Sequence, residues 1–273
     1  MEYPGKIVIF RDSRRIIKEQ DLKTQKKKPE RQIAEKKKTR KPARGVIFDM
    51  DGVLIDSEPL QMKVFNVMMK KRGISMPLKE FIGYVGMKAV DNFRDIIRKY
   101  RLRATPEELV IEKNGLYREV LRGPLRPMPG IRQLLETLKK AGIPIALVSG
   151  SNGRDVRLVL KGLGLAGYFP TVVSGDDVRR GKPHPEGFLK AARLLNLDPA
   201  GIFILEDSSP GTIAGKRGGF RVLAVPTRFT KSQDFSSAER SFMGYRTVKR
   251  FLESEFRLAG TRGQEEGRSR SGS

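Results

Sequence analysis

Four short stretches of the sequence carry acidic, hydroxyl or ammonium side chains, three of them directly after apolar runs and the one with Lys182 in the loop that follows another such run. Carboxylate oxygens that occur in pairs are hard ligands, and such ligands suit Mg²⁺. A serine hydroxyl and a lysine ammonium can stabilise the oxygens of an anionic group, such as a phosphoryl group in transfer. The side chains are, in chain order, Asp49 and Asp51, then Ser149, then Lys182, then Glu206 and Asp207.

The apolar runs before these side chains predict the strands that position them. The runs lack polar alternation, which is typical of a parallel sheet that is covered on both faces. Helical patterns lie between them, so we expect a doubly wound α/β core with a Rossmann-like parallel sheet. Ligands bind beyond the carboxyl ends of the strands in such sheets. The predicted strands are 45–49, 143–149, 171–174, 202–205 and 221–225, and the predicted helices are 131–141, 154–160, 186–195 and 210–216.

A charged, helical segment interrupts this alternation after the first strand. It predicts a small all-α cap inserted into the core, with helices at 64–71, 89–100 and 106–121. The end of the chain predicts a helix near 245–256 and then a frayed tail that is rich in Gly, Ser, Arg and Glu. The expected parts are an arm at 1–44, a core at 45–58 and 127–228, a cap at 59–126, and a C-terminal segment at 229–273.

The charge of the chain is strongly positive. Its 273 residues include 55 Lys and Arg against 31 Asp and Glu, which gives a formal net charge of +24 at pH 7. Residues 1–44 hold 16 Lys and Arg against 6 acids, a net charge of +10, and predict a solvated, mostly disordered arm. Such an arm could contact a polyanion weakly, or it could be a non-essential extension.

Composition excludes several classes of function. The absence of cysteine excludes a disulfide scaffold, a thiolate nucleophile and a cysteine-ligated zinc site. The single histidine, His184, excludes a multi-histidine metal centre and is expected to be a loop residue without a catalytic role. No apolar run approaches the length of about 18 residues that a membrane span needs. Because the amino end lacks the pattern of a secretory signal, we expect a cytoplasmic protein without membrane contact.

The four stretches, taken in order, resemble the motifs of the haloacid dehalogenase-like hydrolase superfamily. The resemblance covers about residues 45–228, and the runs from Phe48 and from Leu205 are similar to the branch with a small helical cap. That branch contains sugar-phosphate phosphatases, phosphoglycolate phosphatases and β-phosphoglucomutase. The matching motifs are Asp49-Met-Asp51-Gly-Val, Ser149-Gly150-Ser151, Gly181-Lys182-Pro183 and Glu206-Asp207-Ser208.

The resemblance implies an Mg²⁺-dependent phosphatase that acts on a small phosphorylated metabolite through an aspartyl-phosphate intermediate. Asp49 is then the nucleophile, and Asp51 protonates the leaving oxygen and later takes a proton from water. The implied phosphate-binding residues are Ser149, Gly150 and Lys182. The implied metal ligands are Asp49, Asp51 through its carbonyl, Asp207 and Glu206, the last directly or through water.

Two residues, one at the border of the predicted cap and one inside it, have two interpretations each. Glu58 either begins the first cap helix or acts at the hinge, for example by positioning water. Lys88, in a stretch that resembles a cap loop reaching into the site, either contacts the substrate or is a solvated helix-start lysine.

Two other functions remain open at this stage. A β-phosphoglucomutase-like mutase is one, although Gln61 stands where such mutases carry a histidine; an isomerised product would distinguish it from a phosphatase. A polyanion or nucleic-acid binding protein that uses the basic arm is the other, and its affinity would fall steeply with salt.

Overall fold

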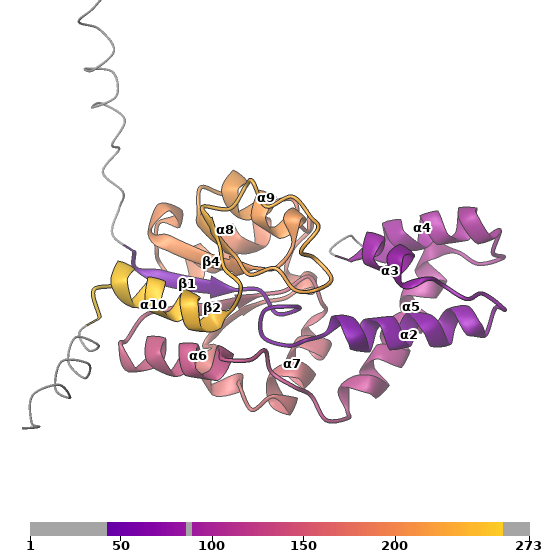
Figure 1. Ribbon diagram of the computed structural model, residues 1–273, viewed down its shortest axis with the longest axis horizontal. Helices are drawn as coiled ribbons and strands as arrows, with labels where there is room; N and C mark the ends of the chain where they lie inside the picture. The colour runs from indigo at the N-terminus through magenta and orange to yellow at the C-terminus, as the bar shows by residue number, and fades with distance from the viewer. Residues whose placement is uncertain (1–42, 86–88, 259–273) are drawn as a thin grey trace, which may run out of the picture. The chain divides into compact units, whose positions relative to one another are not determined.

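The computed structural model describes residues 43–85 and 89–258. Its core contains a six-stranded sheet, three of whose strands are labelled in Figure 1. The strand order is β3-β2-β1-β4-β5-β6, and every neighbouring pair is parallel. The α/β prediction is therefore confirmed. The strands are β1 (Gly45–Phe48), β2 (Ile145–Val148), β3 (Thr171–Val173), β4 (Ile202–Glu206), β5 (Arg221–Ala224) and β6 (Arg240–Ser241).

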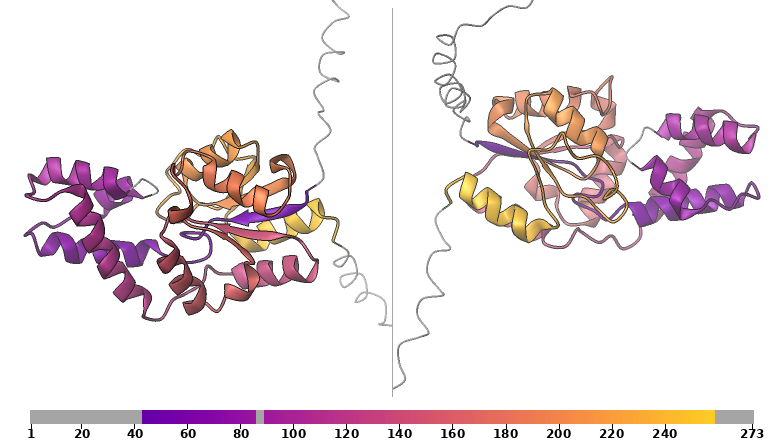
Figure 2. Two further views of the ribbon diagram at one scale, coloured as in Figure 1. Left: turned by 180° about the vertical axis from the view of Figure 1, so that it is seen from behind. Right: turned by 45° about the horizontal axis from the view of Figure 1, so that its top comes forward.

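Helices cover both faces of the sheet because both faces of its central strands are apolar. Val46 and Phe48 of β1 belong to one buried cluster, and Ile47 between them belongs to another. Figure 2 shows the two helix layers on opposite sides of the sheet. This double cover explains why the strand sequences lack polar alternation. The helices that contribute to the cluster of Val46 and Phe48 are α6 (Ile131–Lys140), α7 (Gly153–Gly162) and α10 (Tyr245–Glu255). Those that contribute to the cluster of Ile47 are α8 (Glu186–Leu194) and α9 (Ser209–Arg217).

Four helices lie between β1 and α6 in the chain and share an apolar centre. The ring of Phe65 stacks on that of Phe93 at 5.4 Å and meets the edge of Phe81 at 5.5 Å. We propose that this group is the cap, and we use the word for these helices below. They are α2 (Glu58–Lys70), α3 (Leu78–Tyr84), α4 (Ala89–Tyr100) and α5 (Pro106–Leu121).

The cap differs from the sequence prediction in two places. The first helix begins at Glu58 and not at residue 64, because Pro59 is tolerated in the first turn, where its missing N–H is not needed. The short helix α3 was not predicted, since seven residues are too few for a helical period to stand out. Lys88 lies outside the described residues.

The chain after β5 adds an edge strand and a helix to the core. Arg221 of β5 holds this segment: its guanidinium donates to Glu239 at 2.8 Å and to Glu255 of α10 at 2.7 Å. The same guanidinium lies 4.1 Å from the ring centroid of Phe203 in β4. One buried cation thus ties two parts of the C-terminal segment to the sheet. The two-residue strand β6 carries no sequence signal of its own.

Replacing Arg221 by methionine is expected to destabilise the fold. The change removes a buried guanidinium whose two partners, Glu239 and Glu255, are partly exposed to water, so the free energy of unfolding should fall by about 1–3 kcal/mol. Equilibrium urea unfolding would measure the loss. Arg246→Met on the exposed side of α10 is the control and should stay within about 0.5 kcal/mol of wild type. An equally small effect of Arg221→Met would contradict the prediction.

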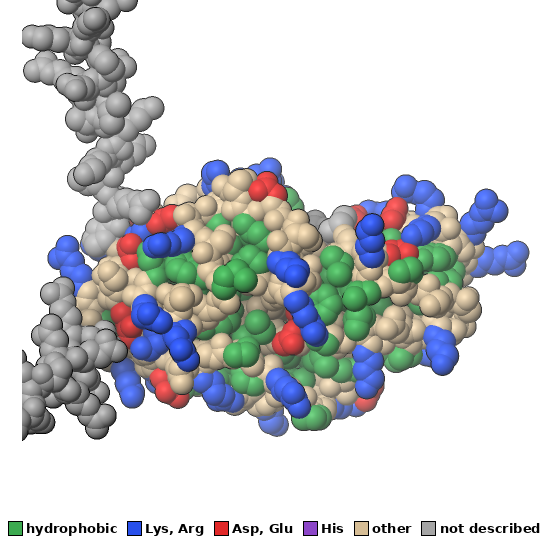
Figure 3. All heavy atoms as spheres, in the orientation of Figure 1, with side chains coloured by type: hydrophobic (Ala, Val, Ile, Leu, Met, Phe, Trp, Pro, Cys, Tyr) green, Lys and Arg blue, Asp and Glu red, His purple; other side chains and the backbone are tan. Residues whose placement is uncertain are grey.

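Positive side chains are spread over the surface. On the face in Figure 3, Lys and Arg lie on the cap helices and on the sheet-bearing part alike, with Asp and Glu among them. Residues 1–42 of the expected basic arm lie outside the described part of the chain, so polyanion binding stays a prediction. Within the described ranges, none of the helices combines the length and the apolar character that crossing a membrane requires.

Candidate active site

The predicted polar groups meet at the carboxyl ends of the central strands. Asp49 directly follows β1, and its backbone N–H donates to the carbonyl of Leu205 in β4 at 3.0 Å. Ser149 follows β2, and its N–H donates to the carbonyl of Val173 at 2.9 Å. Glu206 is the last residue of β4. Because these strands are parallel, groups that are far apart in the sequence lie at one edge of the sheet.

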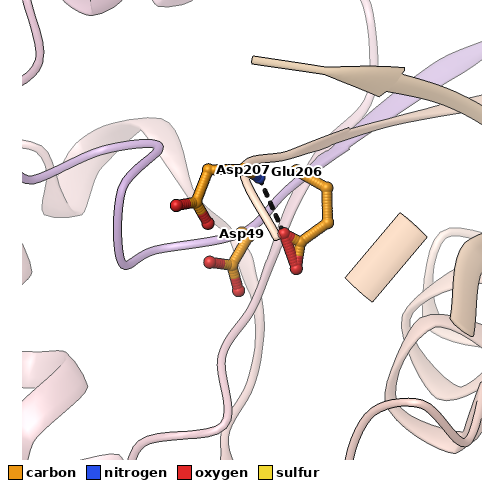
Figure 4. Close-up of side chains that lie close together, drawn as sticks. All are labelled: Asp49, Glu206 and Asp207. Carbon is orange, nitrogen blue, oxygen red and sulfur yellow. Dashed lines mark hydrogen bonds between the residues drawn. The ribbon is translucent and has the colours of Figure 1, made fainter. Parts of the chain in front are cut away.

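Three carboxylates form the centre of this group. Asp49, Glu206 and Asp207 are all buried, and each has a ligand oxygen within 4.8 Å of the others (Figure 4). The backbone N–H of Asp207 donates to Glu206 Oε2 at 2.9 Å, which fixes the orientation of the glutamate.

Two glycines make room for these acids. A Cβ atom at Gly52, whose φ is +71°, would collide with the carboxylate of Asp207. A Cβ atom at Gly211, in the first turn of α9, would collide with the carboxylate of Glu206. Both positions therefore require glycine because of the acids that lie against them.

Lys182 supplies a positive charge between two of the acids. Its ammonium donates to Asp49 Oδ1 at 2.5 Å and also to Glu206 Oε1. Burial disfavours the charged form of Lys182, but the two carboxylates outweigh burial and raise its pKa above the usual value. The residue is therefore an ammonium ion at neutral pH.

The donor set fits a divalent cation such as Mg²⁺. Burial raises the pKa of Asp49 well above its usual range, and it does the same for Asp207, whose neighbour Glu206 adds to the effect. One ammonium does not balance three buried carboxylates, and uncompensated charge in such a place is costly. Carboxylate oxygens are the ligands that Mg²⁺ prefers. The cluster is thus suited to bind a metal.

Asp51 and the serines after β2 lie beside the acid cluster. The hydroxyl of Ser151 donates to Asp51 Oδ2 at 3.3 Å, and the N–H of Ser151 donates to Ser149 Oγ at 3.1 Å. Asp51 Oδ1 is buried without a hydrogen-bond partner among the described residues. Gly150 lies between the two serines and lines the same cavity as Asp51. The contact of the Ser151 side chain was not predicted from the sequence.

Glu58 is brought to the site by the start of α2. Its side chain is buried, and the hydroxyl of Thr227 donates to its Oε1 at 3.5 Å. Burial, aided by the negative charge of Asp51, raises the pKa of Glu58 to about 7. Glu58 both begins the helix and faces the site, so its two predicted roles are compatible. Its function stays a prediction.

A cavity of about 590 Å³ lies in front of the acids. Its cap wall includes the aromatic side chains of Phe65, Phe81 and Tyr84 and the polar side chains of Lys113 and Tyr117. The ammonium of Lys113 lies 5.6 Å from the ring centroid of Tyr117, one helical turn along α5. Burial lowers the pKa of Lys113.

Sequence reasoning missed the polar pair on α5. The helix at 106–121 was predicted, and the spacing of four residues puts Lys113 and Tyr117 on one face of it. That spacing could have grouped the two residues. It could not show that this face borders the cavity, because the position of a helix depends on tertiary packing.

Comparison with known proteins gives consistent results. A family model described as haloacid dehalogenase-like hydrolase matches residues 46–225. A phosphorylated carbohydrates phosphatase of Thermotoga maritima is 32% identical over 185 residues, which cover 64% of this chain and 81% of the relative.

Two further matches differ in how much of the other protein they cover. The bifunctional riboflavin kinase/FMN phosphatase of Arabidopsis thaliana is 31% identical over 71% of this chain, which spans only 51% of that protein. The crystal structure of a HAD hydrolase, family IA, variant 3, from Entamoeba histolytica superposes with a TM-score of 0.70. It is 23% identical, covers 79% of this chain and 98% of that chain, and supports the fold alone.

Proposed function

The chain belongs to the haloacid dehalogenase-like hydrolase family and is a phosphatase-type enzyme of that family, and we propose that it hydrolyses small phosphorylated metabolites such as sugar phosphates with Mg²⁺ as cofactor. One observation carries the proposal. A buried cluster of three acids, Asp49, Glu206 and Asp207, lies with the ammonium of Lys182 at the carboxyl ends of the strands. The similarity to a phosphatase of phosphorylated carbohydrates supports the choice of substrate class.

In this proposal Asp49 attacks phosphorus through a carboxylate oxygen. The new O–P bond replaces the bond between phosphorus and the leaving oxygen, so Asp49 becomes an aspartyl phosphate. Asp51 gives a proton to the leaving oxygen. A water molecule then attacks the aspartyl phosphate and passes a proton to Asp51, which releases inorganic phosphate and restores both acids. Glu58, buried beside Asp51, is proposed to position the hinge or that water.

The other residues hold the charges of the phosphoryl group. Lys182 is proposed to stabilise its oxygens, together with the hydroxyl of Ser149 and the backbone at Gly150. The proposed metal ligands are the carboxylates of Asp49, Glu206 and Asp207 and the carbonyl of Asp51. When bound, Mg²⁺ neutralises negative charge on the phosphoryl group, so that the Asp49 carboxylate can approach it.

A substrate panel with and without metal tests this function. Purified protein is expected to release inorganic phosphate from at least one of fructose 1-phosphate, glycerol 3-phosphate, phosphoglycolate and flavin mononucleotide in the presence of Mg²⁺. Chelation should lower the rate about a hundredfold, because the negative charge of the phosphoryl group is then no longer neutralised as the Asp49 carboxylate approaches. Added Mg²⁺ should restore the rate.

The products decide between the outcomes. Released phosphate supports hydrolysis, whereas an isomerised sugar phosphate without phosphate release would indicate a mutase. A rate that is insensitive to chelation would contradict the metal assignment. Folded protein that hydrolyses none of the four compounds would contradict the proposed function.

A further inference from the structure

The loop after β5 contacts both the acid cluster and the cap. We call residues Thr227–Gln233 the strap. Thr230, which is fully buried, donates its hydroxyl to Asp207 Oδ2 at 3.4 Å. Phe229 meets Phe81 of α3 edge to face at 6.3 Å between ring centroids. The strap therefore lies where the core site and the cap wall of the cavity meet.

The side-chain amide of Gln233 connects the two parts directly. Its Oε1 accepts the backbone N–H of Ser209 at 2.8 Å, and its Nε2 donates to the carbonyl of Val85 at 3.0 Å. Ser209 is the first residue of α9, two positions after Asp207. Val85 follows α3 directly, next to Tyr84. One amide thus joins the helix behind the acid cluster to the helix end that lines the cavity.

The strap holds this amide in place through its own backbone. The N–H of Gln233 donates to the carbonyl of Thr230 at 2.8 Å, and the N–H of Thr227 donates to Thr230 Oγ1 at 2.9 Å. Gln233 is only partly buried, yet both ends of its amide are paired. The contact needs a donor and an acceptor on one side chain, and a carboxylate or a thioether does not supply both.

We infer that Gln233 is a positioning residue, which sets the distance between the phosphoryl site in the core and the cap wall that contacts the leaving group. The inference rests on the proposed function, because it assigns the core to the phosphoryl group and the cap to the rest of the substrate. Loosening α3 should weaken the binding of a substrate that is large enough to reach the cap. It should matter little for a substrate that fills only the phosphoryl site.

Two Gln233 variants test this inference. Gln233→Glu keeps the acceptor for Ser209 but removes the donor to Val85, and Gln233→Met removes both. With the panel compound that wild-type protein hydrolyses fastest, KM should rise about five- to tenfold in each variant, because both variants lose the hydrogen bond to Val85, while kcat stays within about twofold. With acetyl phosphate, whose leaving group is small, KM should change less than about twofold.

Hydrogen exchange measured by mass spectrometry gives a readout that does not depend on turnover. Deuterium uptake in α3 should increase in both variants, whereas uptake in α5 should match wild type, because the lost bond reaches only the end of α3. Ser232→Ala is the control: it changes an exposed neighbour in the strap and should leave KM and exchange unchanged.

The outcomes separate this inference from the proposed function. Unchanged exchange in α3, or an equal rise in KM for both substrates, would overturn the inference. If wild-type protein hydrolysed none of the four compounds of the substrate panel, the proposed function would fail, and exchange in α3 would still decide whether Gln233 holds the cap.

Discussion

Asp49→Asn is expected to lower kcat about ten-thousandfold or more, because it replaces the proposed nucleophile by a group that cannot form the acyl phosphate. The amide keeps the size of the side chain, and its oxygen can still accept from Lys182. The change also removes one of three clustered buried negative charges, so the protein should fold at least as well as wild type. The loss should therefore appear in kcat and not in the yield of folded protein.

Phosphate release under saturating substrate would measure this loss, together with thermal unfolding of the same samples. Asp91→Asn is the matched control: it makes the same chemical change on the exposed side of α4, where Asp91 pairs with Arg94 at 2.7 Å. This control should keep wild-type activity. Residual activity of Asp49→Asn above about one per cent, in folded protein, would rule out Asp49 as the nucleophile.

The strands and the grouping of the site residues could be predicted because their signals are local. The apolar runs before Asp49 and at 202–205 form buried strands within one residue of the predicted bounds, whereas the run before Ser149 forms a buried strand only at 145–148. In a parallel sheet the residues that follow such strands must share one edge, so the grouping follows from the strand assignment alone. The same reasoning gives no contact distances. That Lys182 donates to both Asp49 and Glu206 depends on how its loop packs.

The contacts of the C-terminal segment could not be predicted for a different reason. Residues between β5 and α10 have neither the period of a strand nor that of a helix, so no face of this segment could be assigned to the core. Thr230 and Gln233 act through single hydrogen bonds to Asp207, Ser209 and Val85, which are distant in the sequence. Polar residues in an irregular loop usually face water, and only tertiary contacts distinguish these two.

Lys182→Met is expected to lower kcat/KM about a thousandfold, because it removes the positive charge that contacts Asp49 and that is proposed to stabilise the phosphoryl oxygens. Methionine matches the aliphatic part of lysine and can keep the packing on Phe188, whose ring centroid lies 5.3 Å from the ammonium. The change also leaves Asp49 and Glu206 without their shared cation, so some loss of stability should accompany the loss of activity.

Two measurements separate the catalytic effect of Lys182 from its effect on stability. Inhibition by orthovanadate, an anion shaped like the transferring group, should weaken strongly in folded Lys182→Met, because the ammonium no longer holds its oxygens. Lys190→Met on α8 removes a charge that pairs with Asp177 at 3.1 Å, away from the acid cluster, and should leave kcat/KM and vanadate inhibition unchanged. If folded Lys182→Met kept activity and vanadate inhibition within about tenfold of wild type, Lys182 would be a residue that only balances the charge of the acids. A large loss of both activity and vanadate inhibition, with Lys190→Met unaffected, would place Lys182 on the reacting group. If Lys182 only balanced the charge of the acids, the Lys182→Met protein would be less stable but would keep its affinity for the anion.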